Sequence, residues 1–135
     1  MPFGALEEQI LQAAKNYIAV LEKADELVSK APDQILSGSS STIYLKKLGH
    51  RPLKIEDSEA VINALGSDED KLVISEFHQA QQGISQRLQN TKNIGLVLKQ
   101  AKVPYDQMYK RLTRTDLWKP EQIVQIMEVL QRLQL

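Results

Sequence analysis

The sequence predicts an all-α protein, with a long N-terminal amphipathic helix followed by a C-terminal helical bundle. Apolar residues recur at spacings of three and four along most of the chain, which is the periodicity of helices that bury one face. No segment shows the apolar–polar alternation of a confident strand. A length of 135 residues suits one compact domain with an appended arm. We divide it into segments 1–35, 36–67 and 68–135.

The first segment, 1–35, contains one predicted helix over residues 4–31. Its apolar residues follow a heptad seam, and a second apolar row beside the seam predicts contact with more than one neighbour. Pro32 ends the helix, because the residue before proline disfavours helical angles. The seam consists of Leu6, Ile10, Ala13, Tyr17, Val20, Ala24, Leu27 and Ala31.

This seam has two interpretations. It suits a dimerisation helix, in which a coiled coil with a second copy would use Leu6, Ile10, Tyr17 and Leu27. It suits equally well the core helix of a bundle formed within one chain.

The second segment, 36–67, is expected to hold a loop and short helices. Residues 37–42 are predicted as a flexible polar loop, and they lack the Gly-Lys-Ser/Thr ending of a phosphate-binding loop. A short helix is expected over 43–48, with Gly49 just past its end.

The end of the second segment carries an acidic cluster. Arg51 to Ile55 is expected to be extended, and Asp57 or Ser58 to cap a helix that ends before Gly66. A carboxylate–histidine site is one interpretation of the cluster. We interpret it as a set of capping residues. The cluster is formed by His50, Glu56, Asp57 and Glu59.

The third segment, 68–135, is predicted to be a series of four helices. The first begins at Ser67 or Asp68, and Gly83 weakens it locally. A break at 90–93 separates it from the second, and Pro120 opens the last. The expected inner face of the first of these helices is Val73, Phe77, Ala80, Ile84 and Leu88. The expected inner face of the last helix is Ile123, Ile126, Met127, Leu130 and Leu133.

Charge is distributed unevenly along the chain. The 17 basic and 17 acidic residues cancel, but residues 81–135 hold nine basic and four acidic side chains. The densest basic stretch, 87–119, has eight basic residues against Asp106 and Asp116. Such asymmetry is typical of a surface that binds nucleic acid or an acidic partner, although a solvated helix face also shows it.

Residues 93–112 form a helix-turn-helix-like unit in this prediction. A helix over 94–101 and a helix over 105–112 are joined by three residues, and the second helix of such a unit lies in the DNA major groove. The second helix is expected to bury Tyr105, Met108 and Leu112. Long donors then face outward toward double-stranded DNA. The predicted DNA contacts are Gln107, Lys110, Arg111, Arg114, Lys99 and Lys119.

A short pattern runs through and beyond this unit, formed by Val103, Tyr109-Lys110-Arg111-Leu112, Trp118 and Pro120-Glu121. On these residues the sequence from Asn93 to Leu130 resembles the small Cro/repressor-type helix-turn-helix of bacterial and phage regulators. The resemblance covers about a third of the chain. Ala101-Lys102 stands where that pattern has leucine-glycine. The resemblance implies a transcriptional regulator, or a phage or mobile-element accessory protein, that acts as a dimer.

Several classes of site are disfavoured. The absence of cysteine excludes disulfides, thiol nucleophiles and cysteine-bound metals. We find no converging catalytic residues, so we expect no enzyme, cofactor, metal site or small-molecule substrate. No stretch is long and apolar enough for a membrane helix, and the N-terminus lacks a signal sequence, so a cytoplasmic location is expected. The alternative to DNA binding is a non-enzymatic helical protein–protein interaction module, such as a scaffold, adaptor or neutralising partner.

Overall fold

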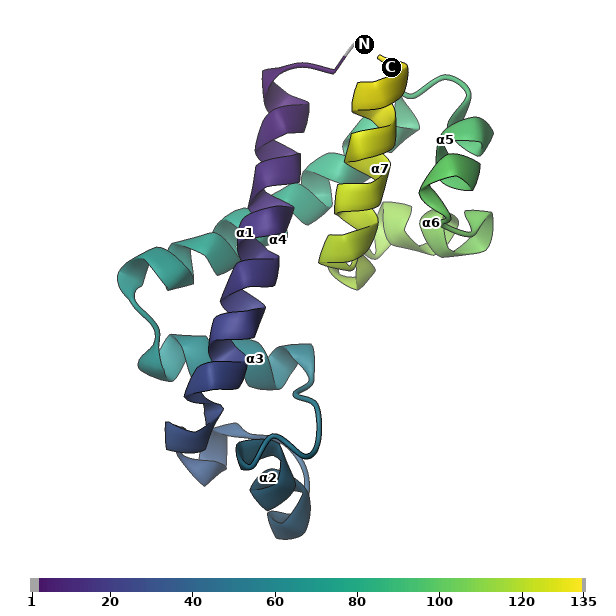
Figure 1. Ribbon diagram of the computed structural model, residues 1–135. Coiled ribbons are helices and arrows are strands. Elements are labelled where there is room, and N and C mark those ends of the chain that lie inside the picture. Colours follow the sequence, from purple (N-terminus) through teal and green to yellow (C-terminus); the bar gives the residue numbers. More distant parts are fainter. Residues whose placement is uncertain (1–2, 135) are drawn as a thin grey trace. The chain divides into compact units, whose positions relative to one another are not determined.

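The computed structural model describes residues 3–134, and within that range it contains helices and no strand. The predicted all-α class, the long N-terminal helix and the C-terminal bundle are confirmed. Residues 1–2 and 135, at the ends of the first and last predicted segments, lie outside the described range. In chain order (Figure 1) the elements are α1 (Ala5–Leu27), η1 (Val28–Lys30), η2 (Asp33–Ile35), α2 (Ser40–Lys47), α3 (Ile55–Leu65), α4 (Asp68–Gln89), α5 (Ile94–Ala101), α6 (Tyr105–Thr113), η3 (Thr115–Leu117) and α7 (Pro120–Leu133).

The chain forms two compact units. The terminal unit contains residues 3–17 and 75–134 of the described range, and the middle unit contains residues 18–74. Helices α1 and α4 each contribute residues to both units. The terminal unit carries ten basic and seven acidic side chains, whereas the middle unit carries seven basic and ten acidic ones. The neutral total is therefore the sum of a positive unit and a negative one.

The core of the terminal unit is built on α5 and α7, which pack against each other (Figure 1). The predicted inner face of α7 is confirmed for four fully buried residues, and Leu133 is half-buried. Pro120 opens the helix as predicted, and the side chain of Gln122 accepts a hydrogen bond from the backbone N–H of Lys119 at 3.1 Å. The four buried residues are Ile123, Ile126, Met127 and Leu130.

The first half of α1 packs on α4 within the terminal unit. The rings of Tyr17 and Phe77 are stacked, with centroids 3.8 Å apart. A Cβ on Gly83 would lie 3.1 Å from Cδ1 of Ile10, so this glycine, predicted only as a weak point of the helix, permits a close approach. Ile10 and Tyr17 are 3% and 0% exposed. The seam thus buries both side chains within their own chain, which favours the intramolecular interpretation of the seam at these two positions.

A buried ion pair joins the beginning of α1 to the end of α4. Nε of Arg87 donates to Oε2 of Glu7 at 2.8 Å, and Nη1 of Arg87 donates to Oγ1 of Thr91 at 2.6 Å. The backbone N–H of Gly4 donates to the other oxygen of Glu7 at 2.9 Å. Burial by itself raises the pKa of Glu7, but these bonds and its own backbone N–H outweigh it and lower the pKa.

In the middle unit α1 ends earlier than predicted. The expected helix over 4–31 is an α-helix only to Leu27, and its last turn tightens into the 3-10 helix η1. The backbone N–H of Ala31 bonds to the carbonyl of Val28, which closes that turn just before Pro32. Leu27, a predicted dimer contact, is half-buried.

Helix α2 begins inside the segment 37–42 that was predicted as a flexible loop. The side chain of Ser39 accepts a hydrogen bond from the backbone N–H of Thr42 at 3.3 Å, so Ser39 is an N-cap and Ser40 is helical. That prediction is therefore wrong for Ser40 to Thr42. Gly49 follows the end of the helix with a φ of 81°, in agreement with the prediction.

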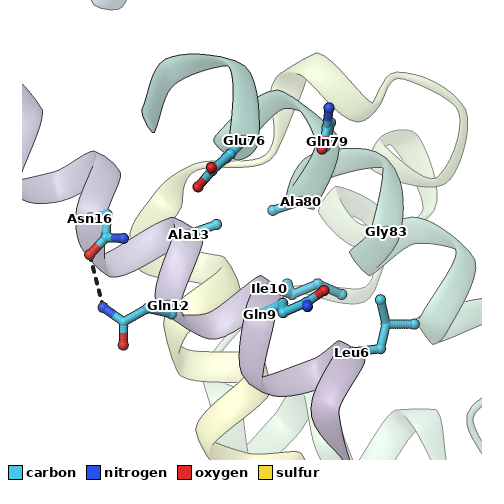
Figure 2. A pocket seen from close by; sticks show the side chains of 10 residues that line it. All are labelled: Leu6, Gln9, Ile10, Gln12, Ala13, Asn16, Glu76, Gln79, Ala80 and Gly83. Atoms are coloured by element: carbon cyan, nitrogen blue, oxygen red, sulfur yellow. Dashed lines mark hydrogen bonds between the residues drawn. The ribbon is translucent and has the colours of Figure 1, made fainter. Parts of the chain in front are cut away.

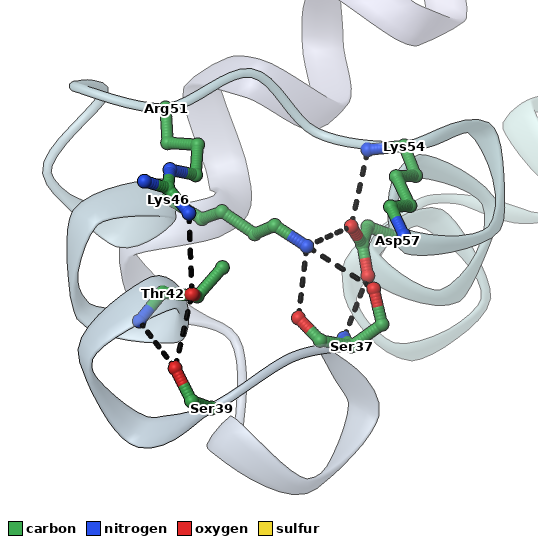
Figure 3. Close-up of polar contacts among 7 residues, drawn as sticks. All are labelled: Ser37, Ser39, Thr42, Lys46, Arg51, Lys54 and Asp57. Atoms are coloured by element: carbon green, nitrogen blue, oxygen red, sulfur yellow. Dashed lines mark hydrogen bonds and ion pairs between the residues drawn. The ribbon is translucent and has the colours of Figure 1, made fainter.

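Helix α3 begins at Ile55, ahead of the predicted caps, so Ile55 is not extended as predicted. Asp57 lies in the first turn of the helix, and its Oδ2 accepts from the backbone N–H of Lys54 at 3.0 Å. The capping interpretation is thus confirmed for Asp57. Its carboxylate bonds to the N-cap residue Lys54 from the first turn of the helix, and not from the position before the helix. The same carboxylate accepts from Nζ of Lys46 at 2.6 Å and from the backbone N–H of Ser37 at 2.8 Å (Figure 3).

The Lys46–Asp57 pair is buried, with side chains 3% and 1% exposed. Nζ of Lys46 also donates to the carbonyl and the hydroxyl of Ser37, at 2.8 and 3.1 Å (Figure 3). Burial by itself raises the pKa of Asp57, but the hydrogen bonds from Lys46, Ser37 and Lys54 outweigh it and lower the pKa to about 2. The pair therefore fixes α2, α3 and the segment before α2 to one another.

Candidate nucleic-acid interface

Helices α5 and α6 are joined by three residues, as the sequence predicts. Lys102 closes α5 in the left-handed region, with φ 59° and ψ 36°, at the position where the helix-turn-helix pattern has glycine. Val103 is buried, and its backbone N–H bonds to the carbonyl of Leu98 at 3.0 Å. Pro104 then leads into α6 with φ −61° and ψ 142°. A buried side chain and a proline thus fix the link between the two helices.

The inner face of α6 differs from the predicted one. Met108 is buried as expected, but Leu112 is only half-buried and Tyr105 is 59% exposed. The prediction for Tyr105 is therefore wrong. Val103, just before α6, is buried, whereas the ring of the first-turn tyrosine lies on the surface. Helix α6 is consequently anchored by fewer side chains than its apolar residues indicate.

The exposed side of α6 carries two aromatic rings with charged residues next to them. Tyr105 and Tyr109 are 59% and 68% exposed, and they are one helical turn apart. Asp106 and Lys110 follow them in the sequence and are also exposed. Sequence reasoning missed the two tyrosines, because both were assigned to packing or to the family pattern. The exposed face of the helix therefore offers phenol, ammonium and carboxylate groups.

Two predicted DNA contacts bond to their own chain. Oε1 of Gln107 accepts from Nε2 of Gln122 on α7 at 3.1 Å. Nη1 of Arg111 donates to the carbonyl of Gln107 and its Nε to the carbonyl of Leu117, both at 3.0 Å. The Arg111 guanidinium also lies 6.0 Å from the ring centroid of Trp118. These two side chains hold α6 to η3 and α7, which is a positioning role.

Polar side chains of α4 support the segment between α6 and α7. Trp118 is buried, as the sequence favours, and its Nε1 donates to Oγ of Ser85 at 2.8 Å. Ser85 in turn donates to the carbonyl of Arg111 at 2.7 Å. Nε2 of Gln81 donates to the carbonyl of Trp118 at 2.8 Å. The chain is thus fixed on both sides of Arg114, the residue that follows the last residue of α6.

The remaining predicted DNA contacts lie on the surface of the terminal unit. Lys99 on α5, Lys110 on α6 and Lys119 before α7 are exposed. Arg114 is exposed and pairs with Asp116, with Nε–Oδ1 and Nη2–Oδ2 distances of 3.2 and 3.1 Å. This pairing lowers the pKa of the Asp116 carboxyl and raises that of the Arg114 guanidinium.

A separate hollow lies between α1 and α4 in the terminal unit (Figure 2). Leu6, at one end of it, is 59% exposed, so among the predicted dimer contacts it is the most accessible. Glu76 is the charged residue among those lining the hollow, and the others are neutral. The neutral ones are Leu6, Gln9, Ile10, Gln12, Ala13, Asn16, Gln79, Ala80 and Gly83.

Residues 3–134 contain no group of three or more histidine, aspartate or glutamate side chains placed to hold a metal ion. No helix in the same range is long and apolar enough to cross a membrane. In the acidic cluster, Asp57 is already bound to Lys46. Comparison with protein-family models, curated proteins and solved structures finds no match to this chain.

Proposed function

We propose that this protein binds double-stranded DNA through α6, as a non-enzymatic transcriptional regulator or an accessory protein of a phage or mobile element. The observation that carries the proposal is the arrangement of α6. Met108 anchors it on one side, and Tyr105, Tyr109 and Lys110 are exposed. A short helix held in this way by a fixed three-residue turn is the element that enters a major groove.

The exposed groups divide into two kinds of contact. Lys110 supplies a donor for guanine or phosphate oxygens, and the ring of Tyr109 supplies an apolar surface for a thymine methyl. Lys99, Arg114 and Lys119 are suited to phosphates, which fix the position of the helix without reading sequence. The local excess of positive charge favours this binding. Gln107 and Arg111 act in this proposal by positioning α6.

The proposal is tested with fluorescence anisotropy on a pool of duplexes with a randomised central segment. Log affinity should fall linearly with log salt concentration, and Lys110→Ala should reduce the slope by about one. Tyr109→Ala should weaken binding by about tenfold at fixed salt. The control, Lys15→Ala, removes the same charge from the exposed side of α1 and should leave affinity unchanged. Lack of binding at the lowest salt concentration would overturn the proposal.

We further propose that a second copy covers the hollow between α1 and α4. A two-fold interface needs a projecting group and a recess on one surface, and exposed Leu6 beside Ala13, Ala80 and Gly83 supports this. Sedimentation equilibrium should show a dimer that Leu6→Gln converts to monomer. Leu72→Gln, at a leucine of similar exposure in the middle unit, is the matched control. A monomeric unaltered protein, or equal behaviour of both variants, contradicts this arrangement.

The second candidate function is a helical protein–protein interaction module. The same hollow favours it, because a recess whose lining is neutral except for Glu76 suits a helix of another protein. This candidate requires that Leu6→Gln abolish a stable complex while the unaltered protein binds no DNA. DNA binding that depends on Lys110 rejects it as the main function.

A further inference from the structure

A second hollow in the terminal unit lies beside the C-terminal half of α6. Five of the side chains lining it carry hydrogen-bond donors, and Leu112 and Leu117 add apolar surface. The donors belong to Gln89, Tyr109, Lys110, Thr113 and Arg114. The two cations have no acidic residue beside them in the lining. Its chemistry therefore matches an anion that is attached to an apolar group, which describes the sugar–phosphate backbone of a nucleic acid strand.

The nearest acidic group in the chain already bonds to one of these cations. The two oxygens of Asp116 face Nε and Nη2 of Arg114, at 3.2 and 3.1 Å. This two-point arrangement is also the one that a guanidinium makes with two oxygens of a phosphate. Asp116 thus occupies the donors that a phosphate at this position would need.

The exposure of the Arg114–Asp116 pair allows Arg114 to exchange Asp116 for another anion. Both side chains are 65% exposed, and an ion pair in solvent is held only weakly. The backbone of Arg114 is fixed, because its N–H bonds to the carbonyl of Lys110 at 3.0 Å and its carbonyl accepts from the N–H of Leu117 at 3.1 Å. Loss of Asp116 would therefore leave the guanidinium beside the hollow.

We infer that the hollow beside α6 is a binding site for a phosphate of the DNA backbone, and that Asp116 competes with that phosphate for Arg114. The inference rests on the proposed DNA binding and deepens it. In the free protein the carboxylate holds the guanidinium in position. In the complex the phosphate replaces it, and the displacement of Asp116 from Arg114 lowers the affinity for any duplex.

The test is a double-mutant cycle on DNA binding, measured against the same randomised duplex pool over a range of salt. Asp116→Asn should bind more tightly, because the phosphate no longer has to displace a carboxylate from Arg114. The ratio of its affinities at about 50 and 200 mM salt should rise by up to about 3.5-fold, the value for one full phosphate contact. Arg114→Ala should bind more weakly. In the Arg114→Ala background, Asp116→Asn should gain no more than Glu128→Gln, which removes an exposed acidic charge from α7.

The outcomes separate this inference from the proposed function. If Asp116→Asn improves binding equally with and without Arg114, or no more than Glu128→Gln does, the competition is disproved while DNA binding stands. If the unaltered protein binds no duplex at low salt, both are overturned. Circular dichroism spectra of the variants should match that of the unaltered protein, because Asp116 and Arg114 are on the surface.

Discussion

Each unit of the molecule contains a lysine or arginine paired with an aspartate, and the two pairs differ in nearly everything except charge. In the middle unit, Lys46 and Asp57 are 3% and 1% exposed and 2.6 Å apart. In the terminal unit, Arg114 and Asp116 are both 65% exposed and 3.1 Å apart. The surroundings of an ion pair, more than its length, decide whether it can take part in binding.

The surroundings differ in the number of other partners. The carboxylate of Asp57 also accepts backbone N–H groups of Ser37 and Lys54, so it links three segments of the chain. Asp116 bonds through its carboxylate to Arg114, two residues away. A buried charge left without its partner is costly, whereas solvent replaces a lost partner at the surface. The first pair therefore stabilises the fold, and the second is available for exchange.

The largest expected effect comes from breaking the buried pair. Asp57→Asn leaves the ammonium of Lys46 buried without a counter-charge, and we expect a loss of about 3 kcal/mol or more in the free energy of unfolding. Urea denaturation followed by circular dichroism measures it. Replacing both residues, with Lys46→Met and Asp57→Asn, should recover part of the loss, because no charge stays buried and the amide oxygen can still accept from the backbone N–H groups of Ser37 and Lys54. A single variant as stable as the unaltered protein would show that the pair does not support the fold.

The pH dependence of stability should also report on the buried Lys46–Asp57 pair. The pKa of Asp57 is lowered from 3.8 to about 2 in the folded protein, so its contribution is fully present above 3.8 and is lost as pH falls toward 2. Glu7, whose pKa is also lowered, acts in the same direction. The urea midpoint should therefore fall through this window, and less steeply in Asp57→Asn. Equal slopes for the two proteins would contradict the assignment to Asp57.

The parts of the fold that the sequence predicts are those decided by local periodicity. The inner face of α7 follows from apolar residues three and four apart, and the link between α5 and α6 follows from Val103-Pro104. These features need no knowledge of distant contacts. The burial of Ile10 and Tyr17 was one of two open interpretations, because a heptad seam packs as well within a chain as between chains.

The parts that the sequence does not predict depend on contacts between elements. Lys46 and Asp57 are eleven residues apart on different helices, so no spacing rule relates them. Arg111 was assigned to DNA by its position on α6, but the carbonyl of Leu117 and the ring of Trp118 lie within its reach. Long cationic side chains can bond back to the chain, and only the folded arrangement shows which of them do so.

The smallest expected effect on stability comes from Asp116→Asn, which makes the same aspartate-to-asparagine change at the exposed Arg114–Asp116 pair. Asp116→Asn removes one hydrogen-bonded charge, as Asp57→Asn does, but solvent screens both partners, so the urea midpoint should not change measurably. Measuring both variants side by side compares the two pairs directly. If Asp116→Asn destabilises the protein as strongly as Asp57→Asn, the Arg114–Asp116 pair is part of the fold. Arg114 would then not be free to exchange its carboxylate for a phosphate.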